Sequence, residues 1–153
     1  MTKYADLLPE EVQLDGGSEL LYRQITPPLM DKGKPSSTAF GPATADEGKP
    51  SFARESKTTP QDARDWHTAN AAKPSLGVWA CSVEEVDAAN TRAVDDSGVP
   101  PQPQQKVAPG HCYVDYRHLD KKDERKVRSA LLAKALAREE IATDGTGEAA
   151  AVA

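Results

Sequence analysis

Long apolar runs, aromatic residues and clustered positive charge are all scarce in this 153-residue chain. Aromatic residues make up 5% of it, and no segment approaches the ~20 apolar residues that a membrane-spanning helix needs. The formal net charge of −5 argues against a general affinity for nucleic acid, because a phosphate backbone requires clustered Lys and Arg. The one basic run, 121–128, is interrupted by Asp123 and Glu124, so a solvated helix face explains it better than a nucleic-acid surface.

Cysteine is rare as well. Cys81 and Cys112 are the only two, they lie far apart, and each falls within an expected strand. Lys3 is followed by acidic residues instead of an apolar run, so we expect no secretory leader and a cytoplasmic protein with both thiols reduced and buried. A disulfide between them would require the two strands to be neighbours, which the sequence does not decide.

The motifs that usually carry chemistry are missing. There is no Gly-x-x-x-x-Gly-Lys phosphate loop and no Gly-x-Ser-x-Gly turn to present a nucleophile. His67, Cys81, His111 and Cys112 are the right residue types for zinc, but structural zinc sites bring their ligands in close pairs such as Cys-x-x-Cys. We therefore expect no metal and no cofactor.

The strongest structural signal is a strand at 111–117 followed by a long amphipathic helix that ends near residue 141. Alternate residues of the strand are apolar, which is the period of a half-buried strand. Asp120 is a good N-cap, and apolar residues recur at helical spacing from Val127 to Leu136. This pair of elements indicates packing and carries no recognisable chemistry.

Shorter elements precede that pair, separated by two loops at 26–50 and 91–109 that are rich in proline. We predict strands at 18–25, 51–54 and 76–81, and helices at 60–71 and 83–89. This order predicts an α+β fold, with a small mixed β-sheet, a long C-terminal helix packed on one face, and flexible termini.

The expected organisation is a single α+β domain over residues 18–142. A flexible acidic arm at 1–17 precedes it, and a disordered tail at 143–153 follows it. The ordered core is modest for the length of the chain, so association with a partner protein or with a second copy of the chain would add buried area that it lacks.

A series of short motifs in the first half of the chain is similar to one that a known group of proteins shares. Its parts are Arg23-Gln24, Ser37-Thr38-Ala39-Phe40-Gly41-Pro42, Asp46-Glu47 and Ser51. In this order the chain resembles a group of small bacterial proteins that share Arg-Gln, Ser-x-Ala-Phe-x-Pro, Asp-Glu and Ser and have no assigned activity. Thr59, Ala63, His67, the Gly77-Val78 pair and the 111–115 strand fit the same pattern, so the resemblance covers roughly residues 20–140. It implies that the 26–50 loop is a fixed feature of a compact domain, and it lends no catalytic role.

The thin core, the acidic arm and the proline-rich 91–109 segment favour a protein-interaction module. On this interpretation the protein is not an enzyme, and it acts as an accessory, regulatory or neutralising partner of a larger protein. The long loop would supply the partner-binding residues, which we expect to be Ser37, Phe40, Asp46 and Glu47.

The alternative is a small enzyme whose site forms where the 26–50 loop meets Arg23, His67 and His111. Long ordered loops are often functional, and histidine is the usual acid or base near neutral pH. No pair of nucleophile and base is recognisable along the chain, so the sequence alone leaves this alternative open.

Overall fold

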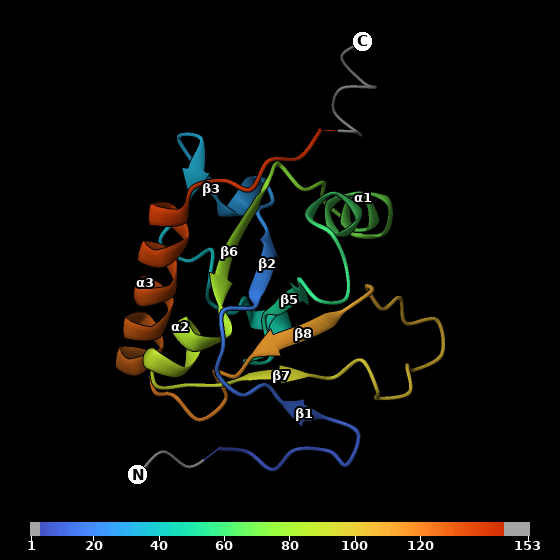
Figure 1. Ribbon diagram of the computed structural model, residues 1–153, viewed down its shortest axis with the longest axis vertical. Coiled ribbons are helices and arrows are strands. Elements are labelled where there is room, and N and C mark those ends of the chain that lie inside the picture. The colour runs from blue at the N-terminus through green and yellow to red at the C-terminus, as the bar shows by residue number, and fades with distance from the viewer. Residues whose placement is uncertain (1–3, 146–153) are drawn as a thin grey trace.

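The computed structural model describes residues 4–145, and its centre is a six-stranded antiparallel sheet (Figure 1). Along the sheet the strands follow the order β1-β7-β8-β5-β2-β6. Their bounds are β1 (Val12–Gln13), β2 (Leu20–Gln24), β5 (Ser51–Arg54), β6 (Val78–Ser82), β7 (Ala93–Asp95) and β8 (His111–Val114). A separate short hairpin pairs β3 (Met30–Asp31) with β4 (Lys34–Pro35).

Helices cover both faces of this sheet. They are α1 (Pro60–Asn70), α2 (Val83–Ala88) and α3 (Lys121–Arg138). Figure 1 shows α2 and α3 on one side of the sheet and α1 on the other. Each helix begins at a side-chain cap, because an oxygen of Thr59, Ser82 or Asp120 accepts a hydrogen bond from the backbone N–H three residues further on.

The strands distribute their side chains between two apolar clusters, one on each face. Leu21 and Phe52 belong to the larger cluster, which also contains Leu131 of α3. Their strand neighbours point the other way, so Tyr22 lies in the smaller cluster together with Ala63 of α1. The α1 face therefore has the thinner apolar layer, and the cavity described below lies there.

The predicted α+β class, with the C-terminal helix packed on one face, is confirmed. The expected mixed sheet is not, because every strand pair is antiparallel. The reason is that β2 lies between β5 and β6 and pairs with both in the antiparallel sense. Helix α1 thus joins two strands that run the same way and never pair with each other.

Strands β1 and β7 were not expected from the sequence. Both lie at one edge of the sheet, where β1 pairs with β7 and β7 pairs with β8. The 91–109 segment therefore begins as a buried strand and only then becomes an exposed excursion. Part of the 1–17 arm is likewise held against the sheet, although the predicted boundary at residue 17 remains a prediction.

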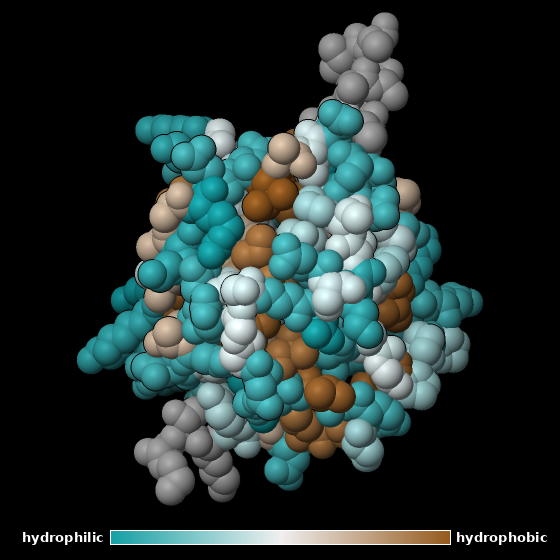
Figure 2. Space-filling view, in the orientation of Figure 1, coloured by the Kyte–Doolittle hydropathy of each residue, from teal (hydrophilic) through white to brown (hydrophobic). Residues whose placement is uncertain are grey.

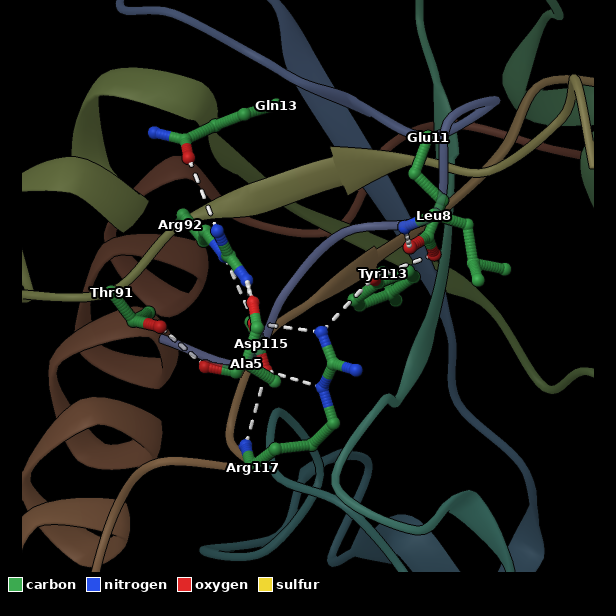
Figure 3. A network of polar contacts seen from close by, with 9 residues as sticks. All are labelled: Ala5, Leu8, Glu11, Gln13, Thr91, Arg92, Tyr113, Asp115 and Arg117. Carbon is green, nitrogen blue, oxygen red and sulfur yellow. Dashed lines mark hydrogen bonds and ion pairs between the residues drawn. The ribbon is translucent and has the colours of Figure 1, made fainter. Parts of the chain in front are cut away.

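A buried ionic network holds this edge together (Figure 3). Asp115 has no exposed surface, and its carboxylate accepts hydrogen bonds from Nε of Arg92 and Nε of Arg117, each at 2.9 Å. Arg92 in turn donates to the carbonyl oxygen of Ala5 at 2.6 Å and lies over the ring of Tyr4 at 4.3 Å. The arm is therefore anchored through a side chain that is itself neutralised by Asp115.

The 26–50 loop folds back on the domain as two short 3-10 turns, η1 (Pro27–Leu29) and η2 (Thr44–Asp46), with the β3–β4 hairpin between them. Phe40 anchors it, because its side chain is fully buried and the hydroxyl of Tyr116 donates a hydrogen bond to its carbonyl oxygen at 2.8 Å.

Both cysteines are buried and free. Cys81 lies on β6 and Cys112 on β8, with β2 and β5 between them, which places the strands roughly 14 Å apart, beyond the reach of a disulfide. Burial raises the pKa of the Cys81 thiol to about 12 and that of Cys112 well above its ordinary value, so both thiols are protonated and unreactive at neutral pH.

The chain leaves α3 along the α1 side of the molecule. Ile141 forms a bridge to Val78, and the hydroxyl of Thr143 accepts a hydrogen bond from Arg64 at 2.8 Å. Most of the tail predicted to be disordered, residues 146–153, lies outside the described residues, as do residues 1–3. Within residues 4–145, none of the helices has both the length and the apolar character needed to cross a membrane.

Candidate functional site

A cavity of about 320 Å³ lies between α1 and the sheet, on the face opposite α3. Its floor is formed by β2 and β5, which contribute Gln24 and Ser51. Trp66 and His67 of α1 form one wall, and His111 lines it from the start of β8. The cavity opens between secondary-structure elements that the chain brings together from distant positions.

Three residues that the sequence suggested for an enzyme site, Arg23, His67 and His111, all line this one cavity. The start of the 26–50 loop also reaches it, through Thr26 and Leu29. The residues of the alternative enzyme site are therefore close together. Whether they can act chemically depends on what each side chain contacts.

The side chain of Arg23 forms hydrogen bonds with backbone carbonyl groups. Its guanidinium donates hydrogen bonds to the carbonyl oxygens of Ala39 at 2.8 Å, Ser51 at 2.9 Å and Gly41 at 3.4 Å. These bonds join the long loop to β5. Burial lowers the pKa of Arg23, and the charge of Asp46 partly offsets that effect. Because its direct partners are neutral oxygens, the guanidinium remains a buried source of positive potential beside the cavity.

Two of the side chains that line the cavity each carry a buried polar atom that has no hydrogen-bond partner within residues 4–145. One is Nε2 of Gln24, whose Oε1 accepts a hydrogen bond from the hydroxyl of Ser75 at 2.7 Å. The other is Nε2 of His67, whose ring is held by a backbone hydrogen bond with Lys73. Burial lowers the pKa of His67, so the ring is neutral at pH 7. Such atoms suit a ligand that can pair with them.

His111 makes a different pair of contacts, one through each ring nitrogen. Its Nδ1 lies 2.6 Å from a carboxylate oxygen of Asp96, and its Nε2 lies 2.9 Å from the hydroxyl oxygen of Ser51. The register of β5 and β8 explains the second contact, because His111 stands opposite Ala53 and is the diagonal neighbour of Ser51 on the same face. The three side chains form a Ser–His–Asp series.

The glycine before His111 permits this approach. Gly110 has a φ of +70°, and a Cβ added there would lie 2.7 Å from Cβ of Lys57. A larger residue would push the start of β8 away from the turn that follows β5. The position of the histidine ring next to Ser51 thus depends on a backbone conformation that favours glycine.

Charge in the cavity is one-sided. Arg23 and Lys106 contribute positive groups, and no Asp or Glu is among the described residues that line it. This contrasts with the net charge of −5 of the whole chain. A cavity of this kind favours an anionic or acceptor-rich molecule over a cationic one.

The residues predicted to bind a partner protein lie elsewhere, in the second half of the long loop. Ser37 and Glu47 are exposed, whereas Phe40 is a core residue whose side chain no surface partner reaches while the loop is closed. Asp46 is partly exposed and accepts a hydrogen bond from the backbone N–H of Ala43 at 2.7 Å. A role for these residues in partner binding remains a prediction.

Sequence reasoning did not find Ser51 and Asp96 as site residues. Ser51 appeared only in the resemblance pattern, and Asp96 lay in a segment interpreted as a linker. Ser51 meets His111 through the pairing of β5 with β8, and Asp96 meets it through the pairing of β7 with β8. Neither pairing leaves a signal in a single sequence. Within the described part of the chain, no group of three or more His, Cys, Asp or Glu residues is arranged to hold a metal ion.

No family model, curated protein or solved structure matches the chain. The function is therefore argued from the geometry of the site.

Proposed function

We propose that the protein binds a small anionic molecule in the cavity between α1 and the sheet. The observation that supports this most directly is the charge of the lining, where Arg23 and Lys106 are not accompanied by any carboxylate among the described lining residues. The volume of about 320 Å³ is within the usual range for small-ligand sites. Its lining is otherwise largely apolar, as is typical of such sites.

The residues that line the cavity have separate roles in recognising the ligand. The unpaired NH₂ of Gln24 can donate to an oxygen of the ligand, and its orientation is fixed by the bond from Ser75 to its carbonyl oxygen. Lys106, on the exposed segment at the mouth, supplies charge that draws the anion in. Trp66 offers a planar apolar surface for a ring or chain of the ligand.

Tryptophan fluorescence provides the test. The chain has two tryptophans, and Trp79 is buried in the cluster on the other face, so a Trp79→Phe protein reports on Trp66 alone. We expect phenyl phosphate to change this fluorescence in a saturable way. Benzyl alcohol, a neutral aromatic of similar size, should not do so at the same concentrations.

Matched substitutions locate the site. In the Trp79→Phe background, Gln24→Leu and Lys106→Gln should each weaken phenyl phosphate binding by roughly threefold to tenfold, since each removes one donor or charge. Lys121→Gln, the same change on the far helix α3, should leave binding unaltered. Equal weakening by Lys106→Gln and Lys121→Gln, or no saturable change in the parent, would contradict the proposal.

A protein-interaction role is the second candidate, favoured by the exposed apolar residues of the arm. Leu8 is 52% exposed and Val12 is 59% exposed, and Val12 lies on β1 at the edge of the sheet. Figure 2 shows apolar patches separated by polar residues on the face in view. A stoichiometric companion that is lost from a Leu8→Ser, Val12→Ser variant but kept by Leu136→Ser would support this role. Equal retention by both variants would contradict it.

A further inference from the structure

We infer that Ser51 is a nucleophile activated by His111, and that the cavity hydrolyses carboxylic esters that carry an acidic group. The preference for an acidic substrate rests on the proposed anion-binding function, whereas the assignment of the nucleophile rests on geometry alone. The two parts can therefore fail separately.

The geometry gives each atom of the series a role. Asp96 lies 2.6 Å from Nδ1 of His111, so Nδ1 carries the proton and donates it to the carboxylate. Nε2 is then the basic nitrogen, and it accepts the hydroxyl proton of Ser51 across 2.9 Å. This is the order of groups that activates a serine in unrelated hydrolases, where it is identified by geometry and not by sequence position.

The carboxylate of Asp96 is free to orient His111, because the neighbouring carboxylate, Asp95, takes the bonds to Arg54 and Ser97. Asp95 points the other way along β7 and bonds to Arg54 at 2.6 Å and to the hydroxyl of Ser97 at 2.6 Å. Asp96 follows the strand and begins a turn, in which its carbonyl oxygen accepts a hydrogen bond from the N–H of Val99 at 3.0 Å. The backbone on both sides of the carboxylate is thus fixed.

Ser51 is exposed and also lines the cavity, so a bound ester can reach its hydroxyl oxygen. Its own carbonyl oxygen is held by Arg23 at 2.9 Å, which fixes the start of β5. Gln24 lines the same cavity with a buried NH₂ that has no partner within residues 4–145. We assign to it the role of donor to the oxyanion of the tetrahedral intermediate, since an amide N–H can supply that hydrogen bond.

The reaction follows from these positions. Oγ of Ser51 bonds to the carbonyl carbon of the ester while its proton passes to Nε2 of His111, and the carbonyl π electrons move to the oxygen. When the C=O bond re-forms, the alkoxide leaves and takes the proton from His111, which gives the alcohol and an acyl-serine. Water then attacks the acyl carbon, His111 takes its proton and returns it to Oγ, and the carboxylic acid departs. The sum is ester plus water to acid plus alcohol.

The competing explanation is a cross-strand tie, in which Ser51 and His111 only join β5 to β8. A purely structural hydrogen bond predicts that Ser51→Ala alters stability and that the wild-type protein has no reactive serine at this position. A nucleophile predicts covalent labelling at one serine. Thermal unfolding of every variant separates a loss of activity from a loss of fold.

The first measurement is labelling of the intact protein with a fluorophosphonate, followed by mass spectrometry of its peptides. We expect the label on Ser51, at least ~100-fold slower labelling in His111→Gln, and no change in Ser129→Ala, which removes an exposed serine of α3, on the other face of the sheet. The absence of label on Ser51 in the folded wild-type protein would overturn the assignment of the nucleophile.

The second measurement is the release of 4-hydroxybenzoate from 4-acetoxybenzoate, compared with hydrolysis of the methyl ester of the same compound. Wild-type protein should exceed the buffer rate, Ser51→Ala should fall to it, and Ser129→Ala should match the wild type. Hydrolysis no faster than in Ser51→Ala overturns the proposed activity.

The charge of the substrate separates the two proposals. The acidic ester should have a KM roughly tenfold below that of its neutral methyl ester. Equal KM values, together with labelling of Ser51, would overturn the preference for an acidic group and leave the nucleophile standing. Saturable phenyl phosphate binding without labelling would support the anion-binding function and overturn the assignment of Ser51 as the nucleophile.

Discussion

Replacing Asp115 by asparagine tests how the β1–β7 edge of the sheet is held together. The carboxylate has no exposed surface and bonds to Arg92 and to Arg117. Burial raises the pKa of Asp115, but hydrogen bonds from Arg117 and Arg92 outweigh it, so the net pKa lies below its ordinary value. The group is therefore charged at neutral pH. Asparagine keeps the size and removes the charge, which leaves Arg92 buried beside a neutral amide.

The expected cost follows from the burial of Arg92, whose side chain is 7% exposed. Removing one partner of a buried ion pair costs about 3–5 kcal/mol, because the other charge is left without compensation. For a chain of this length, 1 kcal/mol shifts the unfolding midpoint by roughly 2–4 °C, so Asp115→Asn should lower the midpoint by about 6–20 °C. That is a large share of the stability of a typical domain.

Thermal and urea unfolding followed by circular dichroism measure this change. Asp31→Asn, the same substitution on the exposed β3–β4 hairpin, is the matched control and should leave the midpoint unaltered. Adding Arg92→Met to Asp115→Asn should restore part of the loss, because no buried charge then remains unpaired. Hydrogen exchange near Ala5 should also speed up in Asp115→Asn, since Arg92 holds that carbonyl. A midpoint equal to that of the control would refute the reasoning.

Further outcomes are expected from local features of the fold. Burial lowers the pKa of His67 and of His118, so the unfolded chain binds more protons than the folded one, and the unfolding midpoint should fall as the pH is lowered from 7 to 5; a flat profile would contradict this. Thr59→Ala removes the cap of α1 and should cost about 1 kcal/mol in urea unfolding, whereas its neighbour Thr58→Ala should cost less. Phe40→Ala should cost about 3–5 kcal/mol, because the ring is fully buried, and a loss under 1 kcal/mol would place it outside the core.

The candidate site shows where sequence reasoning stopped. Arg23, His67 and His111 were singled out from the chain and do line one cavity. Ser51 and Asp96 were not, although they make the closest contacts to the histidine ring. A single sequence reveals which residue types are present on an element, but not which elements pair.

What the sequence determined by itself is local. Thr59, Ser82 and Asp120 cap the three helices as expected, because a cap acts over only three residues. The strand expected at 111–117 is present as His111–Val114, but it is not half-buried, because Tyr113 is buried as fully as Cys112 and Val114. Only the tertiary structure decided that β7 exists and that Ser51 meets His111. That contact joins residues 60 positions apart, and its register follows from the packing of whole strands, which no short stretch of sequence encodes.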